Sequence, residues 1–203
     1  MASDEFLWRG VVYVCTDEEE KMKQVIDECL GSGTQHLCVK GYGTDSPINL
    51  ASIAEKCPNL RTLELHGCKI LSWAALDQPW SSLENLLLVC TSMRWNTFEN
   101  AELHMSLPNI KRLDLYMPQP TNGPSENHNV LLLPDLSDCA GLDKICFENG
   151  HFMIPRMPFY KHPLPSDLGK LVVSGGTFYY YGKNKNMSKD WFVKGLSRCE
   201  IVG

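Results

Sequence analysis

The stretch from Cys57 to Ile70 constrains the fold more than any other part of this chain. From Leu60 onward it reads L-x-x-L-x-L-x-x-C-x-I, with aliphatic residues at the first, fourth, sixth and eleventh positions. Leu63 and Leu65 are two residues apart, which places them on the same side of a β-strand. Cys68 follows at the ninth position, where the chain is expected to turn out of the strand. The stretch therefore predicts a short strand that turns aliphatic side chains into a core and polar ones outward.

The same aliphatic spacing recurs along the chain. First positions fall at 8, 34, 60, 83, 110, 142 and 168, in steps of 26, 26, 23, 27, 32 and 26 residues. The first, fourth and sixth positions are Trp8-Val11-Tyr13, Thr34-Leu37-Val39, Leu60-Leu63-Leu65, Leu83-Leu86-Leu88, Ile110-Leu113-Leu115, Leu142-Ile145-Phe147 and Leu168-Leu171-Val173. Steps of this size are typical of repeat proteins, in which each unit buries its apolar face against its neighbours. We therefore predict a stack of parallel strands.

Helix signals occupy several of the segments between these strands. Thr16 and Glu19 form a capping box. Gly31 and Gly33 end the helix that follows. Ser46-Pro47 predicts the start of a second helix. Asn96 or Thr97 and Ser188 open two more. Their core-facing residues are predicted to be Met22, Val25, Ile26, Cys29 and Leu30; Leu50, Ile53, Ala54 and Cys57; Phe98, Ala101, Leu103 and Met105; and Trp191, Phe192 and Leu196. The segment 152–165 contains four prolines and is predicted to be irregular.

The pattern resembles the leucine-rich repeat, and in particular the cysteine-containing form found in F-box proteins, the substrate receptors of cullin-RING ubiquitin ligases. That family often has a cysteine three residues before the first leucine. The same spacing occurs here in the pairs Cys57–Leu60, Cys139–Leu142 and Cys199–Val202. Other repeats have Trp80, Leu107 or Pro165 at that place, and the ninth-position cysteine occurs only as Cys68. The residues before the first strand are too few for an F-box.

This resemblance implies an α/β leucine-rich-repeat solenoid, with parallel strands on the concave face and helices or irregular segments on the convex face. We expect one domain over residues 1–203 with about seven repeats. Residues 199–203 resemble the opening of an eighth strand. Because solenoids need polar caps, three explanations for this end stay open: a short closing strand, a fragment of a longer protein, or a covering subunit.

Composition and cysteine usage narrow the compartment and the partner class. The chain is 43% apolar and 21% charged, as in ordinary globular proteins, and its net charge of −5 argues against a polyanion partner. Its nine cysteines are an odd number, several fall at core or turn positions of the repeat, and the acidic N-terminus does not resemble a signal region, so we expect reduced thiols in the cytoplasm or nucleus. The absence of a CxxC pair argues against a structural metal site. No apolar stretch is long enough to cross a bilayer, and we expect no membrane association.

No motif predicts catalysis, a cofactor or a metal. Cys38 beside His36 and Cys146 near His66 lie in no catalytic motif, so we interpret both thiols as buried and structural. The six histidines fit no metal-ligand spacing. Gly31-Ser32-Gly33 lacks the lysine of a phosphate-binding loop. We therefore expect a protein that is not an enzyme.

The outward strand positions carry the predicted binding surface, because mixed charges with tyrosine suit a protein or peptide partner. Two further segments have alternative interpretations. Residues 117–128 are either a tolerated insertion or a binding loop on the rim. Residues 175–186 are either a structural edge hairpin or a contact surface, in which at least one of three adjacent tyrosines is exposed. The predicted partner-binding residues are His36, Arg61, Glu64, His66, Lys111, Arg112, Asp114, Tyr116, Lys144, Glu148, Tyr179 and Tyr180.

The resulting functional hypothesis is non-catalytic recognition of a protein or peptide, as an intracellular adaptor or receptor and as a subunit of a hetero-oligomeric complex in one variant. The alternative is an accessory factor of a nucleic-acid or ribonucleoprotein complex. That role would use a local basic strip made of Lys111, Arg112, Lys144 and Lys170.

Overall fold

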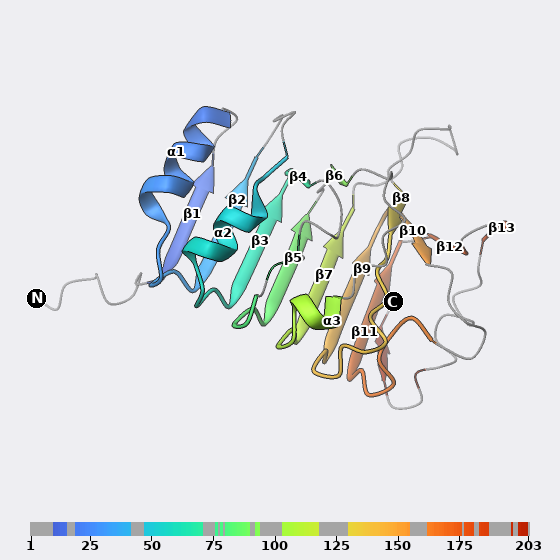
Figure 1. Cartoon of the computed structure of the whole chain (residues 1–203). Helices are drawn as coiled ribbons and strands as arrows, with labels where there is room; N and C mark the ends of the chain where they lie inside the picture. The colour runs from blue at the N-terminus through green and yellow to red at the C-terminus, as the bar shows by residue number, and fades with distance from the viewer. Residues whose placement is uncertain are drawn as a thin grey trace, which may run out of the picture.

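Eight short parallel strands, laid side by side in chain order, form the main sheet (Figure 1). The computed structural model describes residues 10–15, 19–41, 47–70, 76, 78, 80–89, 92–93, 103–117, 130–154, 162–175, 177–180, 183–186, 196 and 199–202. The strands are β1 (Val11–Cys15), β2 (His36–Lys40), β3 (Thr62–His66), β5 (Asn85–Val89), β7 (Arg112–Tyr116), β9 (Lys144–Glu148), β11 (Lys170–Ser174) and β14 (Glu200–Val202). The chain is a parallel-strand solenoid with few helices.

The register of this sheet confirms the aliphatic ladder from the second strand to the seventh. The fourth positions align across the strands as Leu37, Leu63, Leu86, Leu113, Ile145 and Leu171. Each of them is at most 2% exposed. Thr34, a polar residue at a first position, is also buried, because its hydroxyl oxygen accepts a hydrogen bond from the Gly31 N–H. The regular step of the repeat thus fixes which side chains enter the core.

The first strand corrects the prediction by one residue. Val12 and Val14, rather than Val11 and Tyr13, align with the inward residues of β2. The Gly10 carbonyl accepts hydrogen bonds from the N–H groups of both Gln35 and His36, which locks this register. The strand reads Val-Val-Tyr-Val-Cys, apolar on both faces, so its sequence alone does not select one register. Trp8 lies outside the described residues.

The eighth strand forms, but Cys199 does not take the place that its spacing to Val202 predicts. The Cys199 N–H donates to the Leu196 carbonyl, as the Leu60 N–H does to Cys57. Cys199 therefore occupies a first position, with Leu196 three residues before it. The repeat is one residue shorter here, since Glu200 already pairs with Lys170.

The helices α1 (Glu19–Cys29), α2 (Leu50–Lys56) and α3 (Leu103–Ser106) lie along one side of the sheet (Figure 1). The first helix is confirmed, although Cys29 is exposed and not in the core. This helix packs against the end of the stack, so Ile26 is buried, as is Leu30 just after the helix, while the other described side chains of α1 are exposed. Ala54 of the second helix packs partly buried against the core, as predicted.

The second and third helices differ from the prediction at their starts. Asn49 caps α2 in place of Ser46-Pro47, and its side-chain oxygen accepts the Ser52 N–H. The chain just before it is tied to the next repeat, because the Ile48 N–H donates to the Lys69 carbonyl. Met105 of α3 is 68% exposed, since a helix of one turn buries only the side that carries Leu103 and Ser106. Residues 94–102 and 187–195 lie outside the described residues.

Shorter strands cover the core at the other repeats. Strands β8 (Val130–Leu132), β10 (His151–Ile154), β12 (Thr177–Tyr180) and β13 (Lys183–Asn186) form a second sheet in the order β13-β12-β10-β8. A small pair joins β4 (Lys69–Ile70) and β6 (Ser92–Met93). The prediction of an irregular segment from 152 is therefore wrong over the end of β10. Strands β12 and β13 pair antiparallel at the edge of the second sheet, as the hairpin interpretation of this segment predicts; the contact-surface interpretation stays a prediction.

Tight corners connect the two kinds of strand. Gly67, Asn149, Gly150 and Gly175 have positive φ angles at these corners. A Cβ on Gly150 would lie 2.4 Å from the Met117 Cβ, so only glycine fits between the repeats there. Three aromatic rings, Phe147, Phe152 and Phe178, pack in the core behind these corners with centroids 5.0 to 5.5 Å apart. No helix in the described part of the chain is long and apolar enough to span a bilayer.

Candidate functional site

The side of the main sheet opposite its aliphatic rows carries a mosaic of polar and apolar side chains, which we call the open sheet face. It consists of the outward residues of three rows that cross β2, β3, β5, β7, β9 and β11. The rows run His36-Thr62-Asn85-Arg112-Lys144-Lys170, Cys38-Glu64-Leu87-Asp114-Cys146-Val172 and Lys40-His66-Val89-Tyr116-Glu148-Ser174.

Most of the predicted partner-binding residues gather on or beside this face. His36, Glu64, His66, Arg112, Asp114, Tyr116, Lys144 and Glu148 belong to its three rows, and Arg61 and Lys111 lie at the N-terminal edge of the same strands. Tyr179 and Tyr180 lie instead on β12 in the second sheet, and their side chains are outside the described residues. The fold therefore does not place these two tyrosines in the rows of the open sheet face.

Charged residues at the edge of the face pair across neighbouring strands. Lys111 Nζ lies 3.0 Å from Glu84 Oε2, and Arg61 Nη1 lies 3.8 Å from Glu84 Oε1. At the far end of the sheet, Lys170 Nζ lies 2.9 Å from Glu200 Oε1. These exposed pairs contribute little to stability, but they neutralise much of the local charge.

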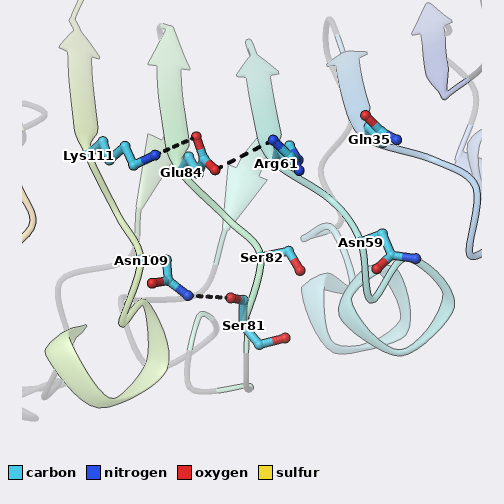
Figure 2. A pocket seen from close by; sticks show the side chains of 8 residues that line it. All are labelled: Gln35, Asn59, Arg61, Ser81, Ser82, Glu84, Asn109 and Lys111. Carbon is cyan, nitrogen blue, oxygen red and sulfur yellow. Dashed lines mark hydrogen bonds and ion pairs between the residues drawn. The ribbon is translucent and has the colours of Figure 1, made fainter.

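A polar hollow of about 390 Å³ opens at this edge (Figure 2). The turns between repeats line it on one side with Asn59, Ser81, Ser82 and Asn109, and the strand starts supply Gln35, Arg61, Glu84 and Lys111. Asn109 Nδ2 donates to the Ser81 carbonyl at 2.6 Å, and Asn59 Nδ2 to the Ser32 carbonyl at 2.8 Å. Asn59 and Asn109 thus tie their turns to the turn before.

At the centre of the face, Asp114 is 1% exposed although it points away from the core. The Arg112 guanidinium pairs with its Oδ2, with the Nε–Oδ2 distance at 2.7 Å, and this contact raises the pKa of Arg112. Asp114 Oδ1 has no hydrogen-bond partner among the described residues. A buried carboxylate oxygen without a hydrogen bond is costly, and the ion pair of the other oxygen with Arg112 offsets part of that cost.

Tyr116 and Cys146 form the neighbouring contact. Burial, followed by its hydrogen bond to Cys146, raises the pKa of the Tyr116 hydroxyl to about 12. Burial also raises the pKa of the Cys146 thiol, so it stays protonated near neutral pH. Cys146 and Cys38 are both buried, which confirms that part of their interpretation.

At the N-terminal end of the face, Glu64 sits between two histidines. Its Oε1 lies 3.0 Å from His36 Nε2, and its Oε2 lies 3.3 Å from His66 Nε2. The Cys38 thiol is close by, and the donor atoms of Cys38, Glu64 and His66 all lie within 4.8 Å of one another. Because the histidines follow no metal-binding motif in sequence, only the sheet register reveals this cluster.

The sequence-based list also missed the apolar part of the face. Leu87 and Val172 lie in the middle row, half-buried, and Val89 lies half-buried in the next row. The sequence of β5 indicates an outward leucine, since it reads Asn-Leu-Leu-Leu-Val and only two of its three leucines can face inward.

No protein-family model matches the chain, and no curated protein does either.

Proposed function

We propose that this chain is a non-catalytic recognition module of the leucine-rich-repeat type, which binds a protein or peptide on the open sheet face. The observation that carries the proposal is the layout of that face. In the middle row, Cys38, Leu87, Cys146 and Val172 alternate with the carboxylates Glu64 and Asp114, and rows of mainly charged and polar residues flank it. Apolar contacts surrounded by polar ones are usual in protein interfaces.

The ion pairs favour a peptide over a nucleic acid. Of the basic strip, Lys111 pairs with Glu84, Arg112 with Asp114, and Lys170 with Glu200. A phosphate backbone would have to compete with these carboxylates, whereas a peptide with mixed charge can exchange partners with them.

The cysteines and the last strand support two further parts of the proposal. Described cysteines that form no disulfide support a reducing compartment, the cytoplasm or nucleus; they are Cys29, Cys38, Cys57, Cys68, Cys139, Cys146 and Cys199. Ile201 and Val202 on β14 are 39% and 41% exposed. An exposed apolar edge strand supports a role as a subunit whose partner covers this edge.

A peptide-display selection against the purified chain tests the binding face. Peptides that bind the unmodified chain should lose at least about tenfold in affinity for the Leu87→Asp variant, because a charge replaces an apolar contact at the centre. The matched control is Glu28→Lys on α1, an exposed site away from the open sheet face. Binding that is unchanged by Leu87→Asp, or equally weakened by Glu28→Lys, would contradict the assignment of this face.

An RNA titration tests the alternative function in the same protein. Single-stranded RNA oligonucleotides should show no binding, even at low salt, if the paired charges leave no basic strip. RNA binding that falls steeply with salt and is lost in Lys111→Glu would instead support the nucleic-acid role.

A further inference from the structure

Three different metal-binding side chains converge on the open sheet face at its N-terminal end. Cys38 on β2 lies directly opposite Glu64 on β3, and His66 follows two residues later on the same face. Their ligand atoms, one sulfur, one carboxylate oxygen and one ring nitrogen, all lie within 4.8 Å of one another. Adjacent strands, about 4.8 Å apart, hold the three side chains in this arrangement, so the cluster rests on rigid backbone and not on a loop.

This set of sulfur, nitrogen and oxygen ligands suits a divalent ion of borderline softness, such as zinc. Zinc binds cysteine sulfur at about 2.3 Å, histidine nitrogen at about 2.0–2.1 Å and carboxylate oxygen at about 2.0–2.2 Å. In a tetrahedral site these lengths place neighbouring ligand atoms roughly 3.3–3.7 Å apart. Side-chain rotations that move the ligand atoms by about an ångström would therefore complete the site. Magnesium and calcium prefer oxygen ligands alone, and the thiol and imidazole select against them.

Partial burial allows the ion to enter while the site keeps its shape. Cys38 is 7% exposed, and the side chains of His66 and Glu64 are 20% and 24% exposed. His36 Nε2, 3.0 Å from Glu64 Oε1, holds the carboxylate in place, as outer partners of metal ligands do.

We propose that Cys38, Glu64 and His66 form a zinc-binding site, with His36 as the positioning residue for Glu64. Three protein ligands leave a fourth position that faces solvent and holds water. On binding, the Cys38 thiol releases its proton to the buffer as the sulfur–zinc bond forms, and His66 binds as neutral imidazole. The inference goes beyond the proposed recognition function and does not depend on it.

Metal titration of the purified, reduced full chain tests the site. We expect one equivalent of Zn²⁺ to bind, and excess Mg²⁺ to leave its affinity unchanged. Co²⁺ should give a thiolate-to-cobalt charge-transfer absorption with the visible bands of a tetrahedral centre, and Zn²⁺ should abolish both. A Co²⁺ spectrum without thiolate charge transfer would overturn the proposal even if no variant could be purified.

Four variants separate the ligands from their surroundings. Cys38→Ser should abolish the charge-transfer band, and His66→Ala should weaken Zn²⁺ binding more than 100-fold. His36→Gln should weaken it by about 10–100-fold, as expected for an outer partner. Cys146→Ser is the matched control, since it removes a buried thiol from the same row. It should leave the Zn²⁺ affinity and the charge-transfer band unchanged. Unchanged binding in Cys38→Ser, or an equal loss in Cys146→Ser, would overturn the site and leave only nonspecific binding to surface histidines.

Discussion

Cys68 shows what one residue does at the corner of a repeat. Its sulfur lies 3.6 Å from the Val39 carbonyl and 3.4 Å from the His66 carbonyl, so its single S–H is shared between the backbone of the preceding strand and that of its own. Burial raises the pKa of the Cys68 thiol to about 11. A protonated thiol at this corner therefore links two repeats, and the same burial makes it a poor nucleophile.

The Cys68 thiol gives stability a specific alkaline pH dependence. The unfolded thiol ionises near pH 9.0 and the folded one near 11. The contribution of this thiol is therefore complete below pH 9 and is lost as pH rises towards 11. The loss amounts to about 3 kcal/mol, at 1.36 kcal/mol per pH unit. Urea unfolding from pH 8.5 to 11 should show a shallower decline in Cys68→Ala than in the unmodified chain. Leu65→Ala, a core truncation without a titrating group, should lower stability equally at every pH.

At the scale of the strand, the register determines which of several chemically identical residues are buried. Leu86, Leu87 and Leu88 are consecutive on β5, yet Leu86 and Leu88 are 1% exposed and Leu87 faces outward, half-buried. The repeat spacing alone predicted this assignment, because first positions at 60 and 83 align Leu63 with Leu86. The strand pattern thus contains most of the information on the core.

The repeat spacing also explains why the Cys–Glu–His cluster was not predicted. A step of 26 residues places Cys38 beside Glu64 on the neighbouring strand. Metal-ligand motifs are recognised by short spacings along the chain, so they do not reveal ligands that come together across a sheet. The first strand failed for another reason. Val12 and Val14 compete with Val11 for the inward face, and the Gly10 carbonyl bonds that choose between them come from tertiary structure. The Asn49 cap likewise depends on Ile48 bonding to the next repeat.

Two truncations on β5 test this difference between faces. Leu86→Ala should lower the free energy of unfolding by about 2–5 kcal/mol, because it leaves a cavity in a fully buried site. Leu87→Ala, one residue away, should cost roughly 1 kcal/mol or less, since its side chain is only half-buried. Denaturant titrations of both variants measure the two values. Equal losses would show that the strand does not hold the register described here.

For the molecule as a whole, the order of strands in the main sheet equals their order in the chain. Each repeat therefore meets its sequence neighbours in the sheet, and stability should divide into terms for single repeats and for their interfaces. The cover of the core changes along the stack, with α1, α2 and α3 towards the N-terminal side and the second sheet towards the C-terminal side (Figure 1). The inward rows of the main sheet are the part that all repeats share.

This nearest-neighbour organisation predicts where mutational effects couple. Leu63 and Leu86 are direct partners on β3 and β5, whereas Leu37 and Leu171 are separated by four strands. Leu→Val truncations keep double variants folded, and their unfolding free energies form two double-mutant cycles. The neighbouring pair should show a coupling energy of about 0.5–3 kcal/mol, because the two side chains share one packing site. The distant pair should be additive within about 0.3–0.5 kcal/mol. Strong coupling of Leu37 with Leu171 would mean that repeats without direct contact in the stack affect each other's stability. The description as a one-dimensional solenoid would then be wrong.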